Sequence, residues 1–187
     1  QEAGKSHKYR RLAGDTLLFG ISSFGSRLLL LLLAPLYTSL LSEAEYGTAD
    51  LVQTTVNFIY PVLTLAMADA ALRFAMDKTC RREAVLGNAL LFTLLSTLLL
   101  LPVYPLIALW QPALAGYFGI FLLIFTLFNL HNALASFLKG LGKTRLFAVQ
   151  AIVQTASIIA GNLLLLLGFG WRLEGYLYSI ALGYLLP

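Results

Sequence analysis

The chain has 187 residues, of which 59% are hydrophobic and only 12% are charged. A soluble domain carries about 25% charged residues. This composition excludes a soluble cytosolic enzyme, a disordered chain and a disulfide scaffold, and it indicates an integral membrane protein. The single cysteine, Cys80, also excludes an internal disulfide and a metal site built from several cysteines.

Six apolar stretches follow one another along the chain. A transmembrane helix needs about 20 consecutive, mainly apolar residues, and the first five stretches reach that length. Pro61 interrupts the second stretch, the pair Pro102 and Pro105 closes the third, and the sixth is too short to cross a bilayer. We therefore expect an all-α, polytopic transmembrane helical bundle with helices over residues 16–41, 48–75, 84–107, 113–137, 145–167 and a truncated 175–187.

The basic residues alternate between the loops. Eleven of the thirteen lie in the N-terminal segment and in the second and fourth loops: Lys5, Lys8, Arg10, Arg11, Arg73, Lys78, Arg81, Arg82, Lys139, Lys143 and Arg145. The first loop has Glu43 and Glu45 but no basic residue, the third has no charge, and the fifth has a single basic residue, Arg172. The positive-inside rule then predicts a cytoplasmic N-terminus. Topology alone explains the net charge of +4, so we expect no nucleic-acid partner.

One charge falls inside the first predicted helix. Arg27 lies eleven residues after Thr16, which is about 16 Å along a helix and close to the middle of the membrane. An arginine there costs at least about 2.5 kcal/mol unless it faces water or a partner. Small and polar residues share its side of the helix, which favours a hydrated cavity. The alternative is a structural arginine paired with a carboxylate.

The second predicted helix carries a stripe of polar residues at spacings of three and four, namely Asp50, Gln53, Asn57, Tyr60 and Thr64. Such a stripe is difficult to place against lipid, where every polar group needs a partner. We interpret it as the lining of a water-filled path, with polar helix-to-helix contacts as the alternative. Further along, Asp69, Arg73 and Asp77 recur every four residues. This spacing favours local ion pairs, and Arg73 could also act at a cytoplasmic gate.

Two weaker polar sets occur in the fourth and fifth predicted helices. They are Asn129, His131, Asn132 and Ser136 in the fourth, and Gln150, Gln154, Ser157 and Gly161 in the fifth. A lone histidine beside asparagines is more often hydrogen-bonded than a proton relay. No phosphate loop, dinucleotide fingerprint or metal-ligand spacing is present in the sequence. We therefore expect no cofactor, no metal and no enzymatic activity.

Four segments together resemble the polysaccharide-biosynthesis flippases of bacteria, the oligosaccharide-lipid branch of the superfamily that includes multidrug and toxin extrusion transporters. They are the opening from Lys8 through DTLLFGISSFGSRLLLLLLAPLYTSLLS, the turn Glu45-Tyr46-Gly47, the closing Ala71-Leu72-Arg73-Phe74, and LKGLGKTRLFA over residues 138–148. Each motif alone is moderately specific. Their order and spacing cover nearly the whole chain.

The resemblance implies a function and a location. Members of this family move undecaprenyl-diphosphate-linked oligosaccharide across the bacterial cytoplasmic membrane for O-antigen, capsule or related polymers. The implied partners are the lipid-linked oligosaccharide, membrane lipids, and polysaccharide polymerase and assembly proteins. Arg27 matches the basic position in the family's first helix, and Arg73 matches the arginine that closes the second. The roles of Asp50, Gln53 and Asn57 rest on periodicity instead.

The family has twelve to fourteen helices in two bundles around a central cavity, whereas this chain supplies about six and starts at Gln1. We expect it to be the N-terminal bundle of a longer transporter whose C-terminal bundle is absent from the chain. Two other functions stay open. The first is a drug or cation antiporter of the sister branch, for which Asp50 is the obvious acidic residue. The second is a membrane scaffold without transport.

Overall fold

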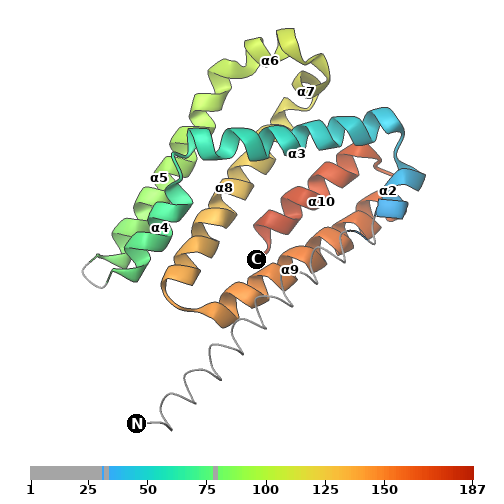
Figure 1. The fold of residues 1–187 in the computed structure, drawn as a ribbon. Helices are drawn as coiled ribbons and strands as arrows, with labels where there is room; N and C mark the ends of the chain where they lie inside the picture. Colours follow the sequence, from blue (N-terminus) through green and yellow to red (C-terminus); the bar gives the residue numbers. More distant parts are fainter. Residues whose placement is uncertain (1–30, 32–33, 78–79) are drawn as a thin grey trace.

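The computed structural model describes residue 31 and residues 34–77 and 80–187. Every regular element within these ranges is helical (Figure 1). In chain order they are α2 (Ala34–Leu40), α3 (Glu43–Leu63), α4 (Met67–Met76), α5 (Arg82–Leu100), the 3-10 turn η1 (Leu101–Val103), α6 (Tyr104–Trp110), α7 (Pro112–Gly116), α8 (Phe118–Gly140), α9 (Thr144–Asn162), the π-helical η2 (Leu163–Gly168) and α10 (Leu173–Leu185). Most of the expected first helix, 16–41, lies outside the described residues.

Three continuous helices among the described residues are long and apolar enough to cross a membrane. They are Arg82–Trp110, Phe118–Gly140 and Thr144–Gly168. The bent pair α3 and α4 makes a fourth if it is counted as one span. These helices support the expectation of an all-helical membrane protein. The last helix, α10, has 13 residues, about 20 Å at the helical rise of 1.5 Å per residue, which is shorter than the hydrocarbon core.

The second predicted helix is bent, but not at the proline. Helix α3 continues through Pro61 and ends at Leu63, and the chain then turns by 56° into α4. Leu65 and Ala66 form the break with φ values of 49° and 56°, in the left-handed region that non-glycine residues rarely adopt. Thr64 closes α3 because its amide and its hydroxyl both donate to the carbonyl of Tyr60, at 3.0 and 2.8 Å.

The third predicted helix extends beyond the expected end at Pro102 and Pro105. The helical path runs on to Trp110, and most of the expected third loop is helical, in η1, α6 and α7. Both prolines lie in the first turn of a new helical segment, η1 for Pro102 and α6 for Pro105. Proline is well tolerated there because those first N–H groups have no partner within the helix. The fourth predicted helix begins later and ends later than expected, as α8.

The helices pack around two apolar cores. The larger joins α2, α3, α8, η2 and α10 around the fully buried Phe121, Phe125 and Leu177. The smaller lies between α4, α5 and α8, around Ala71 and Phe137. Helix α4 packs along α8 and α10 packs along α9, while α3 crosses the bundle near one end (Figure 1).

The outward side of α5 is apolar. Six of its leucines are about half exposed, namely Leu90, Leu91, Leu94, Leu95, Leu98 and Leu99. A soluble monomer rarely exposes an apolar patch of this extent. In a membrane protein such a surface faces lipid, so α5 lies at the periphery of the bundle.

Candidate functional site: polar surfaces of the bundle

The structure does not gather the predicted site residues into one pocket. Asp50 and Asn57 are exposed on α3, whereas Arg73 is exposed on α4, beyond the 56° bend. Gln53 is half-buried, and its Nε2 donates to the hydroxyl of Tyr176 in α10 at 2.9 Å. Arg27 lies outside the described residues. The four described residues therefore divide between an exposed surface of α3, a helix-to-helix contact and the far side of the bend.

The polar stripe on α3 has an outer part and an inner part. Asp50 and Asn57 are two turns apart on the same side of the helix and both are exposed. The inner members are structural, because Thr64 is fully buried and Tyr60 packs its ring edge-on against Phe128, with centroids 5.0 Å apart. Part of the stripe therefore forms contacts between helices, which is the alternative given for it above, and part of it is open surface.

The ion pair expected within α4 between Asp69 and Arg73 is not formed. Among the described residues, no ion pair joins Asp69 to Arg73, although the two are four positions apart on α4. Both side chains are exposed, so each is free to extend into the surroundings instead. The prediction of local pairing is therefore wrong for Asp69 with Arg73.

A polar pocket of about 250 Å³ lies where α8, α9 and α10 meet. It joins the two weaker polar sets of the sequence, because His131, Asn132 and Ser136 of α8 face Gln150 and Gln154 of α9 across it. Its remaining lining residues are Phe128, Ala135, Lys139, Phe147, Ala151 and Tyr184. The spacing of the polar residues indicated each half of this pocket. Only the tertiary contact shows that the halves form one site with Lys139 and Tyr184.

Among the described residues, the lining of this pocket has one cation and no carboxylate. Lys139 is exposed, and its Nζ lies 4.2 Å from the centre of the Phe147 ring. At the other extreme, Gln150 is 7% exposed, and its Oε1 has no hydrogen-bond partner among the described residues. The Nε2 of Gln150 has only long contacts of 3.4 Å to the ring nitrogens of His131. The pocket thus runs from a buried amide to an exposed ammonium group.

Other polar residues of the bundle connect helices. Asn129 donates to Ser96 at 2.8 Å, and Thr97 lies 3.0 Å from Thr126, so two polar contacts join α5 to α8. Asn129, a member of the polar set predicted in the fourth helix, is therefore structural, because its side chain and that of its partner Ser96 are both buried. Such contacts hold membrane helices together where lipid offers no hydrogen bonds.

The buried Asn162 joins three helices. Its Nδ2 donates to the hydroxyl of Tyr37 in α2 at 2.9 Å, and its Oδ1 accepts from the hydroxyl of Ser179 in α10 at 2.8 Å. Both Asn162 and Ser179 are fully buried. This network fixes α2 and α10 against α9.

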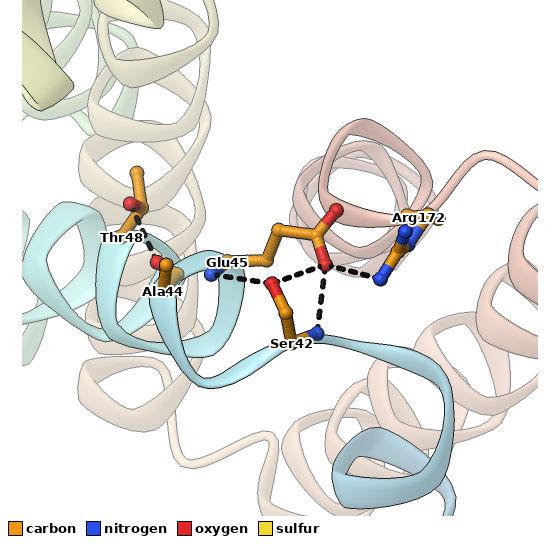
Figure 2. Close-up of polar contacts among 5 residues, drawn as sticks. All are labelled: Ser42, Ala44, Glu45, Thr48 and Arg172. Atoms are coloured by element: carbon orange, nitrogen blue, oxygen red, sulfur yellow. Dashed lines mark hydrogen bonds and ion pairs between the residues drawn. The ribbon is translucent and has the colours of Figure 1, made fainter.

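An ion pair joins the first and fifth loops. Ser42 and Glu45 form a capping box at the start of α3, and Glu45 Oε2 also lies 2.8 Å from Arg172 Nη2 (Figure 2). At the opposite end of α9, Gly140 closes α8 against Leu72 and Ala75 of α4. The first and fifth loops are therefore at one end of the bundle, and the second and fourth are at the other. The alternation of basic loops requires this grouping.

No family model, curated protein or solved structure matches the chain. The resemblance to the flippases therefore rests on the quoted residues. The coarser conclusion, a helical membrane protein, rests on the helices themselves.

Proposed function

We propose that this chain forms part of a flippase that moves undecaprenyl-diphosphate-linked oligosaccharide across the bacterial cytoplasmic membrane. Three features support the proposal. The segments quoted above resemble that family, several helices are long and apolar enough to span a bilayer, and α3 presents polar side chains on its open side.

The exposed polar side of α3 is the observation that carries the proposal. Asp50 and Asn57 lie about 10 Å apart along α3, and both are exposed. A carboxylate facing hydrocarbon costs several kcal/mol, which favours water or a polar substrate beside this side of α3. A sugar headgroup offers many hydroxyls to such a surface, whereas a scaffold has no need of it.

The proposed mechanism is alternating access. The headgroup enters a hydrated cavity beside α3 while its lipid tail stays in the bilayer. Arg27 compensates the diphosphate charge, because an ion pair in a low-dielectric site is stronger than in water. In the full-length protein, Arg27→Ala should abolish translocation without reducing membrane insertion, and Lys8→Ala should leave translocation intact. Normal translocation by a well-expressed Arg27→Ala variant would show that Arg27 does not compensate the diphosphate charge.

Cysteine accessibility tests the hydrated path. In a Cys80→Ala background, Asp50→Cys and Asn57→Cys should react with a membrane-impermeant thiol reagent. The matched control is Phe58→Cys, because Phe58 is 76% exposed on another side of α3, where we expect lipid. Reaction at Asn57 but not at Phe58 supports a water-filled path. Equal inaccessibility at all three positions favours the scaffold.

The substrate is tested in a host whose complete gene is deleted. Undecaprenyl-diphosphate-linked glycan is extracted and quantified against the parent strain. Accumulation of finished oligosaccharide on its carrier, with loss of the surface polymer, supports the flippase and names its sugar. An unchanged carrier pool with intact polymer, in a host lacking a second flippase, rejects it.

A drug or cation antiporter is the second candidate, and the exposure of Asp50 favours it, since such a protein needs an accessible acidic group. Its test is resistance conferred on a drug-sensitive host, which Asp50→Asn should abolish. A wild-type protein that confers no resistance excludes this candidate directly. A mid-membrane Arg27 argues against it, because a fixed positive charge repels cationic drugs.

A further inference from the structure

We propose that the pocket between α8, α9 and α10 binds a monosaccharide that carries one acidic group, such as a sugar acid or a sugar phosphate. The pocket lies apart from the open side of α3, and the inference does not depend on the flippase proposal.

The buried end of the pocket requires a hydrogen-bond donor. Gln150 is 93% buried, lines the pocket, and leaves its Oε1 without a partner. A buried amide oxygen without a donor costs about 1–3 kcal/mol of desolvation, so Oε1 favours an occupant of the pocket that has an O–H group. A simple anion such as chloride or a carboxylate has only acceptors and cannot satisfy Oε1. A ligand hydroxyl can.

The exposed end of the pocket requires negative charge. Lys139 is the sole charged residue in the lining, and no carboxylate is paired with it among the described residues. Its contact with Phe147 leaves the ammonium group able to donate hydrogen bonds at the rim. An anionic group is therefore attracted to this rim.

The walls between the two ends suit a sugar ring. Asn132, Ser136 and Gln154 offer amide and hydroxyl groups, which both donate and accept hydrogen bonds. Phe128, Phe147 and Tyr184 offer ring faces and edges for the C–H side of a pyranose. The rings of Phe128 and Tyr184 are already fixed against each other, with centroids 5.2 Å apart. A rigid, mixed polar and aromatic wall binds a flat hydroxylated ring with little loss of side-chain freedom.

The size of the pocket limits the ligand to one sugar unit. The volume of about 250 Å³ is below the range of roughly 300–1,000 Å³ that drug-sized ligands occupy. It corresponds to about eight water molecules at roughly 30 Å³ each. One ring with its acidic group fits, and an oligosaccharide does not.

The test measures thermal stabilisation of the purified full-length protein in detergent micelles over a titration of each probe. Glucuronate and glucose 1-phosphate should stabilise the protein in a saturable manner. Neutral glucose and inorganic sulfate should bind at least about tenfold more weakly, since glucose lacks the negative charge and sulfate lacks a hydroxyl donor. Equal binding of sulfate would overturn the proposal in favour of a simple anion site, and equal binding of glucose would overturn the role of charge. No saturable stabilisation by either acidic sugar would overturn it altogether.

Two variants with matched controls locate the binding. Lys139→Gln should weaken glucuronate at least about tenfold, and Lys143→Gln, outside the lining, should not. Gln150→Met should leave the ligand-free melting temperature unchanged or raised, because it removes an unpartnered buried amide, and it should still weaken glucuronate. Gln53→Met is its control: it breaks the bond to Tyr176, so it should lower the melting temperature and leave glucuronate affinity unchanged. Wild-type affinity in both Lys139→Gln and Gln150→Met would overturn the assignment of the pocket.

Two sources supply such a sugar, the free metabolite or the headgroup of a glycolipid. An alkyl glucuronide compared with free glucuronate separates them. Tighter binding of the alkyl glucuronide supports a lipid-linked ligand, and equal binding supports the free sugar. Failure of the flippase proposal in the carrier-pool measurement leaves this binding unaffected, so the two proposals fail separately.

Discussion

The network around Asn162 gives the sharpest prediction about stability. Asn162→Ala removes two hydrogen bonds between helices, to Tyr37 at 2.9 Å and from Ser179 at 2.8 Å. Hydrogen bonds between membrane helices are worth about 0.6 kcal/mol on average and up to about 1.7 kcal/mol. The two bonds together thus contribute about 1–3 kcal/mol.

Burial adds a second cost. Tyr37 is 6% exposed, and Asn162 is the only side-chain hydrogen-bond partner of its hydroxyl among the described residues, so the variant leaves a buried hydroxyl without a partner, at a cost of about 1–3 kcal/mol. Ser179 escapes this cost because its hydroxyl also donates to the carbonyl of Tyr176 at 2.7 Å. We expect Asn162→Ala to lower the free energy of unfolding by about 2–6 kcal/mol in total.

The assay is reversible unfolding in mixed micelles titrated with a denaturing detergent and followed by circular dichroism. Tyr37→Phe should cost less than Asn162→Ala, about 0.6–1.7 kcal/mol, because Asn162 keeps its bond to the carbonyl of Ile158. The exposed Asn57→Ala is the control and should stay within about 0.5 kcal/mol of the parent. The double variant of Tyr37 and Asn162 should cost less than the sum of the two. Strict additivity, or an Asn162→Ala no worse than Asn57→Ala, would refute the network.

Two further predictions concern the backbone. Gly183→Ala should destabilise the protein by about 1–3 kcal/mol in the same unfolding assay, because a Cβ there would overlap the side chain of Ile158 on α9. Ile158→Ala should therefore cost less in the Gly183→Ala background than in the parent, because it removes the overlap as well as apolar contacts. Gly47→Ala, with open space around it, should be neutral or stabilising. Ala66→Gly should raise the free energy of unfolding by up to about 1 kcal/mol, since Ala66 has a φ of 56° that glycine adopts without strain. Ala70→Gly, within α4, is the control and should lower the free energy of unfolding by about 1 kcal/mol. An equal loss in the two variants would contradict the strain at the bend.

Most of the individual helices could be predicted from the sequence, but the bends and boundaries between them could not. Apolar length located α8, α9 and α10 to within a few residues, because a spanning helix has to satisfy its backbone hydrogen bonds within itself. The prolines were misleading as boundaries. Pro61 is accommodated inside α3, and the turn occurs at Leu65 and Ala66, where no residue type marks it.

The candidate site shows the same division. Periodicity placed Asp50 and Asn57 on one side of a helix, and the structure confirms that both are exposed on α3. It could not show that the side-chain amide of Gln53 donates a hydrogen bond to Tyr176, a residue 123 positions away. Contacts of that kind depend on which helices meet, and the local pattern of a single helix does not contain this information.

The sequence by itself indicated a helical membrane protein, the approximate positions of α8, α9 and α10, and which loops share an end, because hydropathy, helical period and loop charge are local properties of the chain. Only the tertiary structure decided that two weak polar sets on α8 and α9 face each other with Tyr184 between them, and that Gln150 is buried there without a donor. The physical reason is that a pocket is a property of the space between helices. Its shape depends on crossing angles and close approaches, such as that of Gly183 to Ile158, which only the packed bundle defines.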